Sequence, residues 1–311
     1  MFAAVLLSTT RHLTDEQLEQ LSGLLEAAGP DGHRAFREHD WARLAHAERD
    51  GFWALIAWAE GGSPPVGYAE VIHEPRAWSV EYAVDPSAAR AADTAGALLR
   101  QALSIVATEG GGPVQLWQSR PTPESDAAAR SVGLHGVRDV LQLRCALPVV
   151  DKAWSVTVRA FVVGRDEDAW LKVNNRAFEW HPEQSGWDRA TLAAHENEPW
   201  FDPAGFLLHE EGGRLAGFCW TKVHADERPP LGEIYVIAVD PDFGGRGLGR
   251  QLTLAGLDHL ARAGLTVGML YVESDNRPAR ALYDRLGFTV DHIDRAYTAH
   301  IPAAPSGEET R

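Results

Sequence analysis

The stretch "VDPDFGGRGLGRQL", residues 239–252, places four glycines between a strand-like run and the first turn of an expected helix. The run before it, "EIYVIAV" from Glu233 to Val239, is rich in β-branched residues and predicts a strand that Asp240 and Pro241 end. The run after it carries leucines on one helical face up to Gly264. Unpaired amides at a helix start, bordered by residues without side chains, attract phosphate groups. The stretch therefore predicts a strand, turn and helix that bind a phosphate or pyrophosphate.

Other phosphate-binding turns fit less well. The stretch lacks the Gly-Lys-Ser/Thr of a P-loop, and it does not follow the first strand of its domain as a dinucleotide-binding turn would. A structural turn that holds no ligand is the remaining alternative at this point.

The chain also repeats itself at an offset of about 150 residues. "GFWALIAWAEGGSPPVGYAEVI" from Gly51 resembles "GFLLHEEGGRLAGFCWTKVH" from Gly205, and "WSVEYAVDP" from Trp78 resembles "EIYVIAVDP" from Glu233. The first pair predicts a hairpin and the second pair predicts the strand that follows it, with βα elements after each. We therefore expect a mixed α/β chain of two tandem domains, residues 1–148 and 149–311.

Length and charge agree with this organisation. The chain has 311 residues, about twice the usual size of one domain, and its 45% hydrophobic content is typical of a globular protein. A net charge of -15 opposes binding to nucleic acid and favours a small cationic substrate. We expect a monomer.

The termini and cysteines point to the cytoplasm. The apolar run Phe2–Leu7 has no basic region before it, so it predicts a strand and not a signal peptide, and no stretch is long enough to cross a membrane. Thr14 and Gln17 form a capping-box pattern for a following helix. Cys145 and Cys219 are far apart and lack metal-ligand spacing, so we expect two free thiols, with a disulfide as the alternative, and no metal site.

A second motif leads to a known superfamily. The pattern N-x-x-A-x-x-x-Y-x-x-x-G-F is matched at Asn276, Ala279, Tyr283, Gly287 and Phe288. Together with the glycine turn, it resembles the acetyl-CoA site of the GNAT acyltransferase superfamily, and the resemblance extends over both halves. It implies two GNAT-like domains, a degenerate first one and a catalytic second one. One departure is Gly244, where the family usually has Gln or Arg; we expect this to remove a side-chain contact and not the site.

The resemblance implies a set of residues that bind acetyl-CoA, the acetyl donor. Pantetheine would pair with Ile237, Ala238 and Val239. The pyrophosphate would rest on Gly244, Gly245, Arg246, Gly247, Leu248, Gly249 and Arg250. The start of the next helix would add Asn276, Arg277, Pro278, Ala279, Arg280 and Ala281. The first half either binds acetyl-CoA through Tyr82, Ala83 and Val84 or only forms part of the wall of the acceptor cleft.

Acetyl transfer to an amine needs a base for the amine and an acid for the leaving thiolate. Glu233 precedes the pantetheine-pairing segment on the same strand, where partial burial would raise a carboxyl pKa, and we predict that it is the base. The family places a phenol near the sulfur, so we predict that Tyr283 is the acid. Trp78 and Ala129 align with these two positions in the first half, which would therefore have neither group.

The tandem length and the segments "VNNRAFEWHPEQSGW", "GFCWTKVH" and "LYVESDN" are similar to the mycothiol synthase family. That resemblance implies acetylation of the cysteine amine of cysteinyl-glucosaminyl-inositol. The acceptor would contact Glu38, Glu179, Lys222, Glu233 and Tyr271. An acetyltransferase for another small amine or a protein N-terminus, and a non-catalytic acyl-CoA-binding protein, stay open as alternatives.

Overall fold

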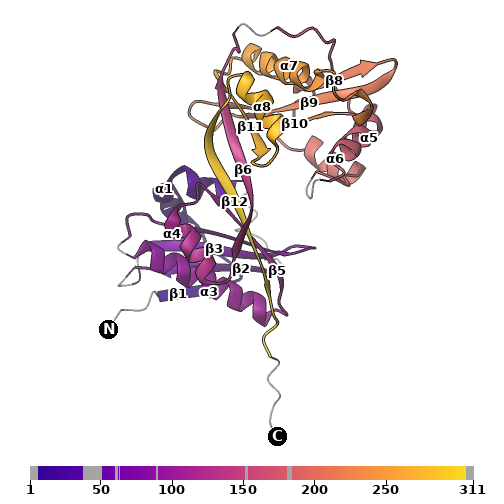
Figure 1. Ribbon diagram of the computed structural model, residues 1–311. Coiled ribbons are helices and arrows are strands. Elements are labelled where there is room, and N and C mark those ends of the chain that lie inside the picture. Colours follow the sequence, from indigo (N-terminus) through magenta and orange to yellow (C-terminus); the bar gives the residue numbers. More distant parts are fainter. Residues whose placement is uncertain are drawn as a thin grey trace. The chain divides into compact units, whose positions relative to one another are not determined.

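The computed structural model describes residues 6–37, 51–59, 62, 64–88, 90–150, 153–180 and 184–305. The chain forms two compact units, one of residues 1–140 with 292–311 and one of residues 141–291. The final strand of the chain therefore belongs largely to the first unit (Figure 1).

The first unit is a mixed sheet with helices on both faces (Figure 1). Its strand order is β1-β2-β3-β4-β5-β12-β6, antiparallel throughout β1 to β4 and parallel between β4 and β5. The strands are β1 (Leu6–Thr10), β2 (Phe52–Trp58), β3 (Pro65–His73), β4 (Trp78–Val84), β5 (Gly112–Ser119), β6 (His135–Ala146) and β12 (Thr289–Ile301). The helices are α1 (Asp15–Arg37), α3 (Ala91–Thr108) and α4 (Pro123–Ser131).

Alternation along β2 distributes its side chains between two apolar cores. Ala54 and Ile56 pack in a cluster with the leucines of α1, whereas Leu55 and Ala57 pack in a cluster with α3. The predicted capping box of α1 is confirmed, because the Thr14 amide donates to Gln17 Oε1 (3.0 Å) and the Gln17 amide donates to Thr14 Oγ1 (3.2 Å).

The second unit repeats this arrangement with the strand order β6-β11-β10-β9-β8-β7. Its strands are β7 (Arg159–Ala160), β8 (Phe206–Glu211), β9 (Arg214–His224), β10 (Leu231–Val239) and β11 (Val267–Glu273). Its helices are α5 (Glu167–Ala177), α6 (Arg189–Glu196), α7 (Leu248–Arg262) and α8 (Arg277–Arg285), with short 3₁₀ turns η1 (Pro203–Gly205) and η2 (Pro241–Phe243). The expected strand and helix around the glycine turn are β10 and α7.

Aromatic side chains fill the core between this sheet and α5. Trp170 of α5 and Trp220 of β9 are both fully buried, with ring centroids 5.8 Å apart in an edge-to-face arrangement. Phe206 of β8 stacks on Trp220 with centroids 4.3 Å apart. The core thereby fixes α5 against β8 and β9.

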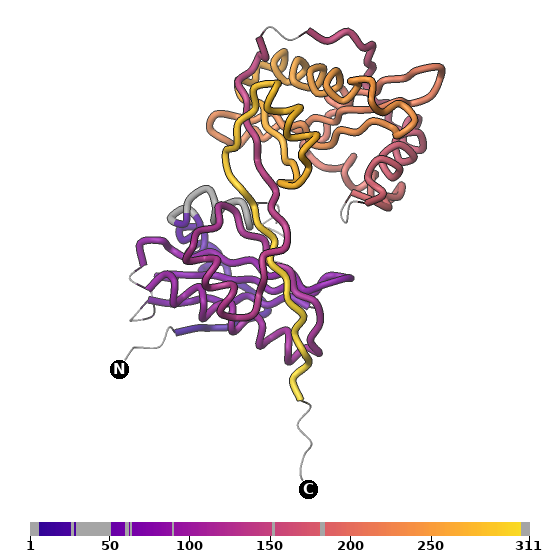
Figure 2. Tube along the Cα trace, in the orientation of Figure 1, coloured from indigo at the N-terminus to yellow at the C-terminus, as the bar shows by residue number. Residues whose placement is uncertain are grey.

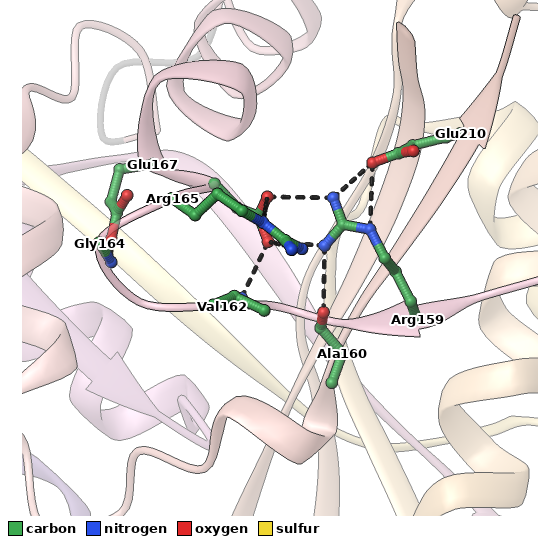
Figure 3. Close-up of polar contacts among 8 residues, drawn as sticks. Arg159, Ala160, Val162, Gly164, Arg165, Glu167 and Glu210 are labelled. Atoms are coloured by element: carbon green, nitrogen blue, oxygen red, sulfur yellow. Dashed lines mark hydrogen bonds and ion pairs between the residues drawn. The ribbon is translucent and has the colours of Figure 1, made fainter. Parts of the chain in front are cut away.

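A charged network anchors the entry to α5 (Figure 3). The Asp166 carboxylate is 6% exposed. It accepts hydrogen bonds from both terminal nitrogens of Arg159, from the Val162 amide (2.8 Å) and from Arg165 Nε (3.1 Å). Arg159 also pairs with Glu210 of β8. Burial opposes ionisation of Asp166, but these hydrogen bonds outweigh it and lower the pKa of Asp166 to about 2.

The two long strands are exchanged between the halves of the sequence. β6 leaves the first unit after Val140 and lies beside β11 in the second, whereas β12 leaves the second unit after Asp291. Residues 294–301 of β12 then pair antiparallel with residues 112–119 of β5. β6 and β12 run next to each other, and their course can be followed along the trace (Figure 2). Each unit is therefore completed by a strand from the other half of the chain.

Both cysteines are free and buried, as expected. Among the helices that the structure describes, none is both long and apolar enough to cross a membrane. Over the same residues, His, Cys, Asp and Glu side chains form no group of three or more that could hold a metal ion.

Candidate active site

The central strand of the second unit is paired along its full length on one side and over part of its length on the other. With β9, β10 pairs from Leu231 to Val239; with β11, the parallel register runs from Leu231–Val267 to Ile234–Leu270. The backbone of Ile237, Ala238 and Val239 lies beyond that last rung. A ligand with an extended amide-containing arm can pair with a strand edge of this kind.

A β-bulge precedes this segment. Glu233 lies opposite Lys222, but Val236 lies opposite Trp220, so β10 has one residue more than β9 between the two rungs. Bulges re-aim side chains next to functional sites. Tyr235 lies at the bulge and packs edge-to-face with Trp220, with ring centroids 5.3 Å apart.

The bulge also corrects the comparison between the two halves. Gly67 lies opposite Val84 in the first unit, as Gly217 lies opposite Val239 in the second. Five residues after each of these glycines come Ile72 and Lys222, which therefore match. β3 and β4 pair without a register shift, and Ile72 lies opposite Ser79. Ser79, and not Trp78, is therefore the counterpart of Glu233, because a sequence alignment cannot show the extra residue of the bulge.

The first unit also has carboxylates on this face of its sheet. Glu70 of β3 is 1% exposed, and it lies directly opposite Glu81 of β4, one diagonal step from Ser79. The first half is therefore not without acidic side chains on this face, although none occupies the cross-strand place of Glu233.

Glu233 is a buried carboxylate with a histidine partner. Its side chain is 8% exposed, and its Oε2 lies 2.7 Å from Nε2 of His224, whose side chain is 28% exposed. His224 sits on β9 opposite Leu231, one diagonal step from Glu233 on the same face. Sequence reasoning missed His224, although alternation along "WTKVH" places it on the face of Lys222.

Two of the expected acceptor residues share this face with Glu233. Lys222 Nζ lies 4.5 Å from the ring centroid of Trp200 and 5.4 Å from that of Tyr235. Tyr271 follows Met269, the β11 partner of Glu233, by two residues, and its hydroxyl accepts a hydrogen bond from Gln142 Nε2 (2.6 Å).

The structure describes only one of the other two expected acceptor residues. Glu179 is exposed in the turn that follows α5. Glu38 lies outside the described residues.

The glycine turn owes its residue type to the backbone. Gly245 and Gly247 have φ of +76° and +77°, and a Cβ at either position would meet no atom within 4 Å. Glycine is therefore required by the left-handed conformation and not by crowding. Gly247 is the N-cap of α7 and has no side chain to cover the first amides of the helix, which include those of Gly249 and Arg250.

Ion pairs from two other elements hold this turn. Asp240, 2% exposed, accepts from Arg176 Nη1 of α5 (2.7 Å) and from the amide of Asp242 (2.9 Å). Asp242 also pairs with Arg176 (2.9 Å) and with Arg214 of β9 (2.6 Å). Hydrogen bonds from Arg176 and then Arg214 lower the pKa of Asp242 to about 2. Arg246 points back toward Glu211 (3.3 Å). The sequence pattern gave no signal for Arg176.

The second motif forms the start of α8. The Asn276 side chain accepts from the amide of Ala279 (3.2 Å) and caps the helix, with Pro278 in its first turn. Arg280 Nη1 donates to the Ser274 carbonyl (2.6 Å). An open cavity of about 440 Å³ lies against the helix and is lined by Leu143, Arg277, Arg280, Ala281, Asp284, Phe288, Thr289 and Val290.

Tyr283 is buried on the inner face of α8. It is 7% exposed, and its ring centroid lies 5.6 Å from that of Phe288. Burial, with a smaller contribution from Cys219, raises the pKa of Tyr283 well above that of an ordinary phenol. The phenol is therefore protonated at neutral pH. Its counterpart in the first unit is Ala129, because the Tyr283 and Ala129 carbonyls accept equivalent amide bonds from Phe288 and Leu134 after each helix.

The first unit has a strand opening at the matching place. Its β4–β5 register ends at Val80–Leu116, so Tyr82, Ala83 and Val84 lie beyond the last rung. There the Tyr82 hydroxyl accepts a hydrogen bond from Gln118 Nε2 (2.7 Å) of β5. This bond links the two strands, and burial raises the pKa of Tyr82 to about 12.

Solved structures share this architecture. A GCN5-related N-acetyltransferase from Sphaerobacter thermophilus is similar over 96% of both chains with a TM-score of 0.73 and 22% identity. A tandem GNAT protein from the clavulanic acid biosynthesis pathway covers 97% of this chain and all of its own, with a TM-score of 0.65 and 18% identity. The expected fold, a mixed α/β chain of two GNAT-like domains, is confirmed.

Sequence relatives give a closer match. The family model described as Acetyltransferase (GNAT) family matches residues 172–288. The mycothiol acetyltransferase of Acidimicrobium ferrooxidans is 43% identical over 90% of this chain and 92% of its own, and that of Thermomonospora curvata is 42% identical over 93% and 96%. The chain belongs to the mycothiol acetyltransferase family of tandem GNAT proteins.

Proposed function

We propose that this protein transfers the acetyl group of acetyl-CoA to the cysteine amine of cysteinyl-glucosaminyl-inositol, which gives mycothiol. The names of relatives at about 40% identity over nearly the whole chain support the reaction and the acceptor. The observation that carries the proposal is the buried Glu233, placed one residue before the last β10–β11 rung and four residues before the exposed edge at Ile237.

Acetyl-CoA binds along that edge and the turn that follows it. Pantetheine pairs with Ile237, Ala238 and Val239, and the pyrophosphate rests on the amides of residues 244–250. The two positive-φ glycines support this placement, because they keep the approach to the first turn of α7 clear of side chains. The residues at the start of α8, Asn276 to Ala281, line the other side of the donor.

The chemistry needs one proton acceptor and one proton donor. Glu233 removes a proton from the acceptor ammonium, and the freed nitrogen lone pair forms the new C–N bond to the thioester carbonyl carbon. The C–S bond then breaks, and Tyr283 gives its proton to the departing thiolate. The raised pKa of Tyr283 supports this role, since the donor must still carry its proton when the thiolate leaves.

The acceptor lies on the face that Glu233 shares with Lys222 and Tyr271. Glu179 and Glu38 are further candidates for its ammonium or sugar hydroxyls. The net charge of -15 supports a cationic acceptor, which long-range attraction would concentrate near the protein.

Catalysis is confined to the second unit. The matching places in the first unit are occupied by Ser79 and Ala129, and the matching strand opening is bridged by Tyr82 and Gln118. We assign the first unit to acceptor binding or stability, and the whole protein acts as a monomer.

The experiment is acetyl transfer by Glu233→Gln, with the acetylated product counted by mass spectrometry. Product is the better readout because the acceptor carries a thiol of its own, which obscures the thiol released from coenzyme A. We expect turnover to fall by about 10² or more with acetyl-CoA affinity retained.

Two further arms test the assignment. A panel of polyamines, aminoglycosides and peptide N-termini should react far more slowly than cysteinyl-glucosaminyl-inositol with the parent protein. An Ala83→Trp variant would crowd the buried cluster that Ala83 shares with the leucines of α1, next to the strand opening of the first unit. If its unfolding temperature shows that it is folded, it should keep most of the turnover. Near-normal activity of the Glu233 variant would place the base elsewhere, and loss of turnover through Ala83 alone would move the chemistry to the first unit.

A further inference from the structure

We propose that His224 is a positioning residue for acetyl transfer, which holds the Glu233 carboxylate in the orientation that accepts the amine proton. The proposal rests on the role of Glu233 as the base. The observation behind it is a contact across the β9–β10 hairpin, in which His224 Nε2 lies 2.7 Å from Glu233 Oε2.

The hairpin fixes the two side chains relative to each other. Glu233 pairs with Lys222 in the strand register and His224 pairs with Leu231, so both side chains lie on one face at diagonal positions. Both residues precede the bulge at Tyr235 and therefore lie in the regular part of the ladder. The geometry is set by backbone hydrogen bonds and does not depend on a loop.

The contact assigns different tasks to the two carboxylate oxygens. A hydrogen lies between Nε2 and Oε2 at this distance, and with Nε2 as the donor the bond occupies Oε2. Oε1 is left to take the proton of the acceptor ammonium. The O–H bond forms as the N–H bond breaks, the electron pair stays on nitrogen, and the carboxyl group later releases the proton to solvent.

The histidine also sets the charge beside the base. A neutral imidazole donates to the carboxylate without cancelling its charge, whereas an imidazolium at the same distance stabilises the ionised carboxylate and weakens it as a proton acceptor. Side chains of other titratable residues on this face are Lys222 from β9, Tyr235 from β10 and Tyr271 from β11. An uncharged hydrogen-bond donor at the place of Nε2 would therefore hold the carboxylate without weakening it as a proton acceptor.

The two members differ in their access to water. The Glu233 side chain is 8% exposed and that of His224 is 28% exposed. A buried carboxylate that loses its hydrogen-bond donor turns toward other partners, which changes the orientation of its free oxygen. Removal of the imidazole should therefore act on turnover more than on binding.

The test compares His224→Leu with His224→Gln. Leucine removes the donor, whereas the glutamine amide can donate to Oε2 from the place of Nε2 but cannot become a cation. We expect the leucine variant to lose turnover by about tenfold or more, with the KM for the acceptor and the affinity for acetyl-CoA changed by less than about threefold. We expect the glutamine variant to recover most of the turnover, because its side-chain amide restores the hydrogen bond to Oε2.

Controls separate this proposal from a folding defect and from the role of the base. Val223→Leu changes the neighbouring side chain of the same strand, which is 41% exposed, and should leave turnover unchanged. Unfolding temperature and acetyl-CoA calorimetry establish that each variant is folded. The double variant Glu233→Gln with His224→Leu should be no slower than Glu233→Gln alone, because the two residues act as a unit.

The outcomes are distinct. If Glu233→Gln is inactive but His224→Leu has the turnover and pH profile of the parent, the histidine does not position the base. If the glutamine and leucine variants are equally slow, the hydrogen bond to Oε2 is not what matters and the proposal also fails. If Glu233→Gln is itself fully active, the proposed function has lost its base and the inference about His224 falls with it.

Discussion

Replacing Asp166 by asparagine should remove a pH-dependent part of the stability of the second unit. The pKa of Asp166 is lowered to about 2 from an ordinary value of 3.8, with the side chain 6% exposed. At 1.36 kcal/mol for each pKa unit, a difference of just under two units is worth about 2 kcal/mol at pH 7.

The direction follows from the two pKa values. A carboxyl group whose pKa is lower in the folded state stabilises that state at any pH above the unfolded value, here about 4. The stabilisation is lost as the pH falls through the folded value near 2. At pH 3 about half of it should remain.

The assay is urea unfolding of the parent and Asp166→Asn proteins between pH 7 and pH 2.5, followed by tryptophan fluorescence. Asp168→Asn is the matched control, because Asp168 also pairs with an arginine, Arg189, but is 74% exposed. The difference in unfolding free energy between parent and Asp166→Asn should shrink toward acid pH, and the control should show little change. A difference for Asp166 that is the same at pH 7 and pH 3 would refute the assignment of the stabilising charge to this carboxylate.

Three further results are expected at the site. Tyr283→Phe should lower turnover by about tenfold or more with acetyl-CoA affinity unchanged, because it removes a buried proton donor; single-turnover kinetics would show an unaffected rate if Tyr283 only packs. Gly247→Val and Gly264→Val should both lower the unfolding temperature, since their φ values are +77° and +88°. Calorimetry should show weakened acetyl-CoA binding only for Gly247, which is the N-cap of α7, where we propose that the pyrophosphate binds. Arg176→Met should weaken acetyl-CoA binding more than Arg214→Met, because Arg176 holds the buried aspartate of the turn and Arg214 only the exposed one; equal affinities would remove Arg176 from the support of the turn.

The residues of the glycine turn could be interpreted from the sequence because the signals there are local. A strand, several glycines and a leucine-lined helix lie within one continuous stretch. Gly247 has φ near +77°, a conformation that favours glycine, so the residue type itself indicates the turn. The same holds for the capping box at Thr14 and for the repeated hairpins, whose alternation and turn residues lie close together in the chain.

The register of the hairpins could not be predicted in the same way. The extra residue in β10 near Tyr235 leaves no mark in the alternation of "EIYVIAV", and it shifts the counterpart of Glu233 from Trp78 to Ser79. Cross-strand pairing is decided by which backbone groups meet, and that depends on both strands together.

Contacts between distant segments were decided only by the tertiary structure. Arg176 reaches the turn at Asp240 from 64 residues away, and the exchange of β6 and β12 joins residues 112–119 to residues 294–301. The sequence determined the glycine turn and the place of Glu233 on its strand, because each follows from neighbouring residues, and it determined the repeat, because the two halves have similar segments in the same order. The structure determined the partner of that carboxylate, the support of the turn and the strand that completes each unit, because these form only when segments far apart in the chain pack together.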